Sequence, residues 1–226
     1  GMLYGPAVVV AGLFLFLPER DPGHAGHAPV RRRDLLRDRR YWALALGMGL
    51  GTAPGVVLIG NLKPIGTAWG ITGAALTAAI SALAIGNALG RILWGALQDR
   101  LPDRRGATRL SLALIAVSAV LPLLIGRTPE GFLASAVFAG LCYGGCLSIY
   151  PAQVADIYGA HVLGTVYPLV LLSHGIFAQL GPALCGYLED RTGSYVPGLV
   201  VAAAGAIAAL VLYITLMPRH TDKTTL

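Results

Sequence analysis

The stretch GNALGRILWGALQDRLPDRR, residues 86–105, decides the fold class of this chain. It begins inside a long apolar segment and ends in a run of charges, and Arg91 lies within the apolar part with no acidic residue nearby. A charge at membrane depth costs on the order of a few kcal/mol, so it is rare and marks a functional residue by default. We therefore expect Arg91 to bind an anion in a solute pathway and residues 99–105 to form a cytoplasmic loop. The alternative is that Arg91 snorkels to the membrane interface.

The composition indicates a polytopic membrane protein. The 226 residues are 55% hydrophobic and only 12% charged, whereas soluble domains carry about 25% charged residues. The net charge of +6 does not indicate nucleic-acid binding, because the basic residues cluster in particular loops. Cys142, Cys146 and Cys185 all fall in apolar segments, so we expect them to pack as small side chains without disulfides.

Six apolar segments predict six membrane-spanning helices, at residues 41–60, 71–97, 110–125, 131–150, 162–188 and 197–217. Residues 1–17 are apolar but short for a span, so we expect them to be the end of a transmembrane helix and the chain to be truncated there. Residues 18–40 form a basic linker and residues 218–226 a polar tail. His24 and His27 lie in a Gly- and Pro-rich part of the linker, where a solvated pair is favoured over a metal site. The expected fold class is an all-α membrane protein, a six-helix bundle of residues 41–217 plus a partial preceding helix.

The distribution of Lys and Arg predicts the topology. The linker, the loop after residue 97 and the tail together carry thirteen basic residues, and the intervening loops carry three, Lys63, Arg127 and Arg191. Because cytoplasmic loops are enriched in Lys and Arg, we expect the linker, that loop and the tail to be cytoplasmic, in a cell membrane and most simply a bacterial inner membrane.

Glycines recur at a spacing of four residues in three of the predicted helices. The sets are Gly47, Gly51 and Gly55; Gly86 and Gly90; and Gly140 and Gly144. Small residues at this spacing let helix backbones approach closely in lipid, where packing replaces the hydrophobic driving force. The pattern predicts a tight helix bundle.

Several polar residues are candidates for a solute site. Asn87 and Trp94 lie about one turn on either side of Arg91 and share its stripe, since residues three and four apart are neighbours on a helix. Arg offers a planar fork of donors that matches a carboxylate. His174 lies near the centre of another span with Tyr167 on its stripe, and it can bind a solute as a cation, carry a proton, or donate to a backbone carbonyl. Further candidates in or just after the segment 131–150 are Tyr143, Tyr150 and Gln153.

An enzyme is not expected. Ser173 and His174 are adjacent, and adjacent side chains on a helix point about 100° apart, so they cannot form a nucleophile–base pair. No other catalytic set, metal cluster or phosphate-binding loop stands out, so we expect no cofactor.

The charged end of the opening stretch resembles the loop motif of the major facilitator superfamily, G-x-x-x-D-R-x-G-R-R. The matching residues are Gly95, Asp99, Arg100, Arg104 and Arg105, while Pro102 replaces the second Gly and Asp103 the first closing basic residue. In that superfamily the motif joins two helices on the cytoplasmic side. The resemblance implies that these five residues form a gating loop motif in a bundle of major facilitator type.

The chain resembles the oxalate/formate antiporter family more closely. The pattern NxxGRxxWGxxxDR matches from Asn87 to Arg100, and the loop LKPIGTAWGIT (62–72) and the segment YPAQVADIYG (150–159) add to the likeness. This resemblance implies that the chain is the C-terminal six-helix half of a twelve-helix transporter, with the N-terminal half as its missing partner. In that family an Arg and a Lys bind a dicarboxylate, and these positions fall on Arg91 and His174.

The differences from the family patterns bear on the solute. A neutral His174 leaves one fixed cation, which suits a monocarboxylate, and a protonated His174 restores a second charge. Related monocarboxylate porters carry D-x-x-x-R, and here Asn87 replaces the acidic residue, so His174 becomes the candidate proton site.

The expected function is secondary transport of a small organic anion, a mono- or dicarboxylate such as formate, oxalate, lactate or pyruvate, by antiport or proton-coupled symport. The expected substrate-binding residues are Arg91, His174, Asn87, Trp94, Tyr167 and Tyr143. The alternative function is a membrane sensor or scaffold that retains the transporter fold without moving a solute.

Overall fold

The computed structural model describes residues 32–101 and 103–217. The predicted helix end at residues 1–17, the histidines at 24 and 27, most of the linker and the tail lie outside the described residues. The described elements are α2 (Arg32–Arg37), α3 (Arg39–Ala68), α4 (Gly73–Arg100), α5 (Arg104–Ile125), α6 (Pro129–Tyr158), the 3-10 turn η1 (Ala160–Val162), α7 (Leu163–Thr192) and α8 (Val196–Leu216). In this part of the chain, the six helices α3 to α8 are long and apolar enough to cross a membrane. The predicted all-α, multi-pass membrane fold is confirmed.

The structure corrects several predicted boundaries. Residues 62–68 belong to α3, where the sequence analysis placed a loop at 62–72. The connection between α4 and α5 is residues 101–103 only, not 99–105, because Asp103 caps α5 by accepting a hydrogen bond from the Arg105 backbone N–H. The end of the predicted linker is also helical, as α2 and the first turn of α3. Hydropathy located the spans but not their ends, because capping and backbone hydrogen bonds extend helices beyond the apolar window.

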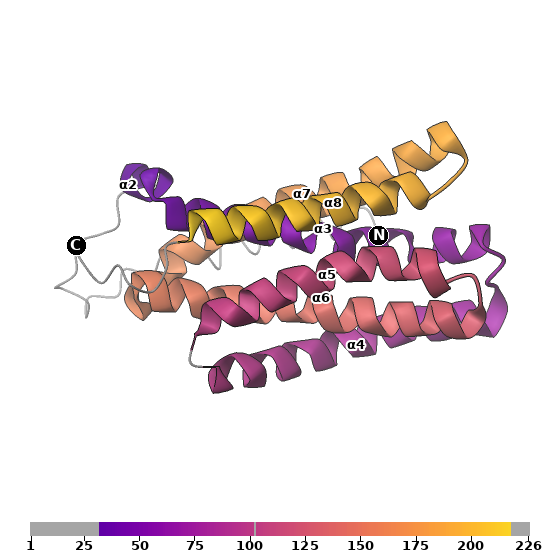
Figure 1. Cartoon of the computed structure of the whole chain (residues 1–226), viewed down its shortest axis with the longest axis horizontal. Coiled ribbons are helices and arrows are strands. Elements are labelled where there is room, and N and C mark those ends of the chain that lie inside the picture. Colours follow the sequence, from indigo (N-terminus) through magenta and orange to yellow (C-terminus); the bar gives the residue numbers. More distant parts are fainter. Residues whose placement is uncertain (1–31, 102, 218–226) are drawn as a thin grey trace, which may run out of the picture.

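The six long helices lie side by side along one axis (Figure 1). Helix α2, the α4–α5 connection and η1 lie at one end of the bundle, and the α3–α4, α5–α6 and α7–α8 connections lie at the other (Figure 1). Helix α3 contacts each of α4, α5, α6, α7 and α8, and is the central element. The connections that the charge count grouped on one side of the membrane, α2 and α4–α5, do lie at the same end.

Two apolar clusters fill the bundle, one toward each end. The first includes Leu44, Met48, Leu112 and Tyr213, and it also buries Leu35 of the short helix α2. The second includes Leu58, Ile65, Phe132 and other residues near the opposite end. Side chains of α3, α6 and α7 meet at the inner edge of the first cluster, to which Tyr143 belongs.

The α4–α6 contact depends on glycine. A Cβ at Gly86 would lie 2.7 Å from the Val137 carbonyl oxygen, and one at Gly90 would lie 3.0 Å from the Leu141 carbonyl carbon and collide with its oxygen. On α6, a Cβ at Gly140 or Gly144 would likewise collide with a carbonyl oxygen of α4. The two helices therefore meet backbone to backbone, as the spacing of these glycines predicted.

Candidate functional site

Three polar side chains from three helices meet in the middle of the bundle. His174 of α7 lies between Thr52 of α3 and Tyr143 of α6: its Nδ1 is 2.8 Å from the Thr52 hydroxyl oxygen and its Nε2 is 3.5 Å from the Tyr143 hydroxyl oxygen. Thr52 is fully buried, Tyr143 is 8% exposed and His174 is half-buried. We call Thr52, Tyr143 and His174 the polar cluster.

Arg91 adjoins the polar cluster from α4. Its guanidinium is exposed, and it is close enough to Tyr143 and to Tyr167 of α7 to act electrostatically on both hydroxyl groups. Arg91 lies nine residues from the end of α4 and His174 eleven residues from the start of α7, about 14 Å and about 17 Å along their helices. Both residues are therefore at a similar depth, measured from the end of the bundle that holds the α4–α5 connection. No carboxylate pairs with Arg91 among the residues that the structure describes.

Asn87 and Trp94 lie in the α4–α6 contact, one turn from Arg91 on either side. The Asn87 side-chain oxygen is buried and, among the described residues, has no hydrogen-bond partner. Trp94 is 7% exposed, and its indole N–H donates to the Leu141 carbonyl oxygen at 3.1 Å. The structure thus places Trp94 against α6 and leaves Asn87 with a free acceptor next to Arg91.

The α7 helix is held against α3 by side chains of consecutive residues. Ser173 donates across the contact to the Ala45 carbonyl oxygen at 2.6 Å, while His174 reaches Thr52. A Cβ at Gly49 would lie 2.7 Å from the Phe177 ring and 3.2 Å from the Ser173 Cβ, so this glycine permits the close approach. Ser173 and His174 bond different groups, in agreement with the prediction that they form no dyad.

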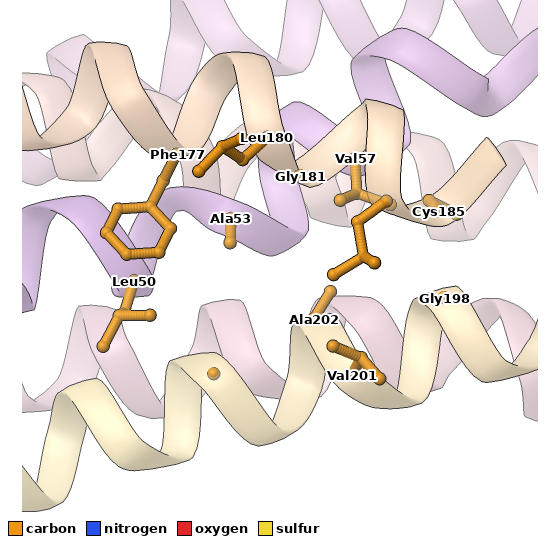
Figure 2. Close-up of a pocket in the computed structure, with 12 residues that line it drawn as sticks. Leu50, Ala53, Val57, Phe177, Leu180, Gly181, Cys185, Gly198, Val201 and Ala202 are labelled. Atoms are coloured by element: carbon orange, nitrogen blue, oxygen red, sulfur yellow. The ribbon is translucent and has the colours of Figure 1, made fainter. Parts of the chain in front are cut away.

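One apolar pocket of the bundle is separate from the polar cluster. It has a volume of about 220 Å³ and lies between α3, α7 and α8, where Leu50, Val57, Phe177, Leu180 and Val201 are among its lining side chains (Figure 2). The lining includes neither Arg91 nor His174 and offers no charged group. It does not suit a carboxylate.

The predicted gating loop motif forms a charged group at one end of the bundle. Arg104 donates to both carboxylate oxygens of Asp156 of α6, at 3.0 and 3.1 Å, and lies 3.7 Å from a carboxylate oxygen of Asp99 of α4. Arg100 is exposed, and Gly95 and Arg105 are partly buried. The motif therefore links the ends of α4, α5 and α6.

Two of the further candidates on α6 are structural. Tyr150 is 1% exposed and belongs to the first apolar cluster. Gln153 is 2% exposed. It forms hydrogen bonds with the Thr108 hydroxyl and the Arg104 carbonyl oxygen, both of α5, and with the Tyr213 hydroxyl of α8. Neither joins the polar cluster, because both side chains point into the packed interior. Of the three candidates in this part of α6, only Tyr143 lies at the site.

Sequence reasoning missed Thr52 and Asp156. Thr52 stands in the apolar run GTAPG and no periodicity marks it, since its role depends on a partner 122 residues away. Asp156 stands in the quoted segment YPAQVADIYG, but its pairing with Arg104 spans 52 residues. A buried hydroxyl in a span and an acidic residue at a helix end are both too common to be singled out without the fold.

The six membrane-length helices in the described part of the chain define a polytopic membrane protein. The family model described as the Major Facilitator Superfamily matches residues 44–225, and this chain belongs to that superfamily.

Curated relatives share this region. The chain is similar to the monocarboxylate transporter 13 of Bos taurus, with 29% identity over 165 residues, 72% of this chain and 37% of the relative. It is similar to the oxalate:formate antiporter of Oxalobacter formigenes, with 22% identity over 77% of this chain and 42% of the relative. It is also similar to the apicoplast pyruvate carrier 1 of Toxoplasma gondii, with 33% identity over 46% of this chain and 18% of the relative. The chain thus spans about two fifths of the length of the first two of these relatives.

Proposed function

We propose that this chain forms one half of a secondary transporter for small monocarboxylate anions, and that Arg91 binds the carboxylate. The observation that carries the proposal is an arginine within the α4 span whose charge acts on Tyr143 and Tyr167 and which, in the described part of the chain, has no carboxylate partner. An unpaired cation in the membrane needs a counter-charge. A carboxylate solute supplies it and accepts two parallel hydrogen bonds from the planar guanidinium. The names of the relatives, which include monocarboxylate, oxalate:formate and pyruvate carriers, agree with this solute class.

The charge at the site favours one carboxylate over two. Arg91 is the one permanent cation that reaches the polar cluster among the described residues, because His174 is neutral unless it takes up a proton. A monocarboxylate therefore neutralises the site, whereas a dicarboxylate such as oxalate requires His174 to be charged as well. We propose that His174 is the proton site when transport is coupled to protons, in place of the acidic residue that Asn87 replaces.

The outward face of the helices suits a second half. Large apolar side chains of α4 and α7 are exposed on either side of the site, among them Ile85, Ile92, Leu172 and Ile176. We propose that this face packs against a second six-helix unit, which encloses the carboxylate between the two halves and lets them rock by alternating access. The connections at the α2 end, which carry the gating loop motif, would face the cytoplasm.

Uptake into proteoliposomes tests the role of Arg91. Labelled formate, lactate, pyruvate and oxalate are offered to vesicles that hold both halves of the proposed transporter, with this half unmodified or carrying Arg91→Gln or Arg127→Gln. Arg127 is a matched control because it carries the same charge but stacks on Trp69, 4.5 Å from the ring centre, near the opposite end of the bundle. We expect Arg91→Gln to lose at least ~100-fold of the uptake rate, since a charged hydrogen-bond pair that the second half encloses is worth a few kcal/mol. Uptake by Arg91→Gln equal to that by Arg127→Gln would reject the proposal.

The same vesicles separate the modes of coupling. Uptake that requires unlabelled carboxylate inside indicates exchange, and uptake into empty vesicles driven by an inward proton gradient indicates symport. Carboxylate binding that saturates without any flux in either condition would favour the sensor or scaffold alternative.

A further inference from the structure

The Thr52 hydroxyl determines which nitrogen of His174 carries the proton. Its oxygen lies 2.6 Å from the Met48 carbonyl oxygen and 3.2 Å from the Gly49 carbonyl oxygen, both in the preceding turn of α3. Carbonyl oxygens only accept hydrogen bonds, and a hydroxyl has a single proton. The Thr52 hydroxyl therefore donates its proton to the Met48 carbonyl oxygen, the nearer of the two. The Thr52 oxygen is then an acceptor toward His174 Nδ1 at 2.8 Å.

The opposite nitrogen is consequently the basic one. If Nδ1 donates to Thr52, a neutral imidazole has its lone pair on Nε2. Nε2 faces the Tyr143 hydroxyl at 3.5 Å, a long contact, and the two ring centres are 6.2 Å apart. Nδ1 instead faces a hydroxyl that is fully buried in the α3–α7 contact. A proton that arrives from the solute side therefore meets Nε2.

Among the described residues, no charged side chain bonds to the His174 ring and competes with Thr52 or Tyr143 for its nitrogens. Tyr143 of α6 is the titratable group that hydrogen-bonds to it, and the charge of Arg91 of α4 acts on that tyrosine. Helix α3 presents Thr52, while its charged residues lie near its ends. The titratable residue of α8, Tyr213, is bonded to Gln153.

We propose that Thr52 is a positioning residue that holds neutral His174 as the Nδ1–H tautomer, so that Nε2, on the Tyr143 side, takes up the coupled proton. This rests on the proposed function in one respect, that protons are coupled to solute movement. The step is a plain proton transfer: Nε2 gains a proton to give the imidazolium and later returns it, with Nδ1–H bonded to Thr52 throughout. On Nε2 the proton lies on the same side as the carboxylate that Arg91 binds.

Nitrogen-15 NMR of the histidine-labelled protein in lipid tests the tautomer directly. The resonances of His174 are identified by their loss in His174→Gln. We expect Nδ1–H in the unmodified protein and in Thr52→Ser, which keeps the hydroxyl. We expect the Nε2–H form to appear in Thr52→Val, which has nearly the same shape but no acceptor. Ser173→Ala is the matched control, because it removes a hydroxyl from the same helix contact that bonds only to carbonyls.

The pH profile of uptake gives a second measurement. The imidazolium donates a stronger, charge-assisted hydrogen bond to Thr52 than the neutral ring does. Loss of the acceptor therefore penalises the charged form, and half-maximal proton-driven uptake in Thr52→Val should move to lower pH by about half a unit to one unit. Thr52→Ser and Ser173→Ala should keep the original profile.

Two results would overturn the inference: an Nε2–H tautomer in the unmodified protein, or an unchanged tautomer in Thr52→Val. The first needs no variant to fold. Either result can occur while Arg91→Gln still abolishes uptake, and normal uptake by Arg91→Gln leaves the NMR result unaffected, so the two proposals fail separately.

Discussion

Gln153 is predicted to be the polar side chain on which the packing of α5, α6 and α8 most depends. Its amide nitrogen donates to the Arg104 carbonyl oxygen at 3.0 Å and to the Thr108 hydroxyl, and its amide oxygen accepts from the Tyr213 hydroxyl at 2.8 Å. Gln153, Thr108 and Tyr213 are all at most 2% exposed, so water cannot replace these partners.

We expect Gln153→Leu to lower the free energy of unfolding by about 2–3 kcal/mol. Leucine has a similar volume, so the repacking cost is small, about 1 kcal/mol or less. Thr108 can turn its hydroxyl to the Arg104 carbonyl oxygen of the preceding turn and remain satisfied. The Tyr213 hydroxyl loses its 2.8 Å acceptor and keeps only the Thr108 hydroxyl within reach. A buried donor without a good acceptor costs about 1–3 kcal/mol.

The assay is reversible unfolding in mixed micelles, followed by tryptophan fluorescence. Gln98→Leu is the control, because Gln98 is also 2% exposed but makes one hydrogen bond, to the Ile149 carbonyl oxygen at 3.3 Å. In Gln153→Leu/Tyr213→Phe the orphaned hydroxyl is gone, so the double variant should be more stable than the sum of the two single losses implies. Equal losses in Gln153→Leu and Gln98→Leu, or strict additivity with Tyr213→Phe, would refute this reasoning.

Two further predictions concern α4. Gly90→Ala should lower the free energy of unfolding by about 1–3 kcal/mol in the same assay, because the new Cβ meets the Leu141 backbone. Gly95→Ala should not lower it measurably, since no atom of another element lies within 4 Å of a Cβ at this position. Equal effects of the two substitutions would contradict the close α4–α6 contact. Trp94→Phe removes the hydrogen bond to the Leu141 carbonyl oxygen and should lower the free energy of unfolding by about 1 kcal/mol. The KM for carboxylate uptake should stay unchanged. A raised KM at unchanged stability would instead return Trp94 to the substrate site.

The sequence by itself determined the class of structure and the depth of the charged residues. Hydropathy and length identified six spans because lipid requires apolar helices with satisfied backbones, a constraint that acts locally and is visible residue by residue. The same constraint made Arg91 and His174 conspicuous, since each interrupts an apolar segment. The glycine spacing predicted a tight bundle, because close contact between helix backbones depends on a side chain being absent.

Only the tertiary structure decided which helices meet and therefore which polar groups act together. Thr52 and His174 are brought together by the α3–α7 contact, and Gln153, one of the candidates for the solute site, is buried against α5 and α8. Helical periodicity places a residue on a face but does not say which neighbour that face meets. The tautomer of His174 follows from a hydroxyl 122 residues away, and such a pairing exists only once the helices are packed.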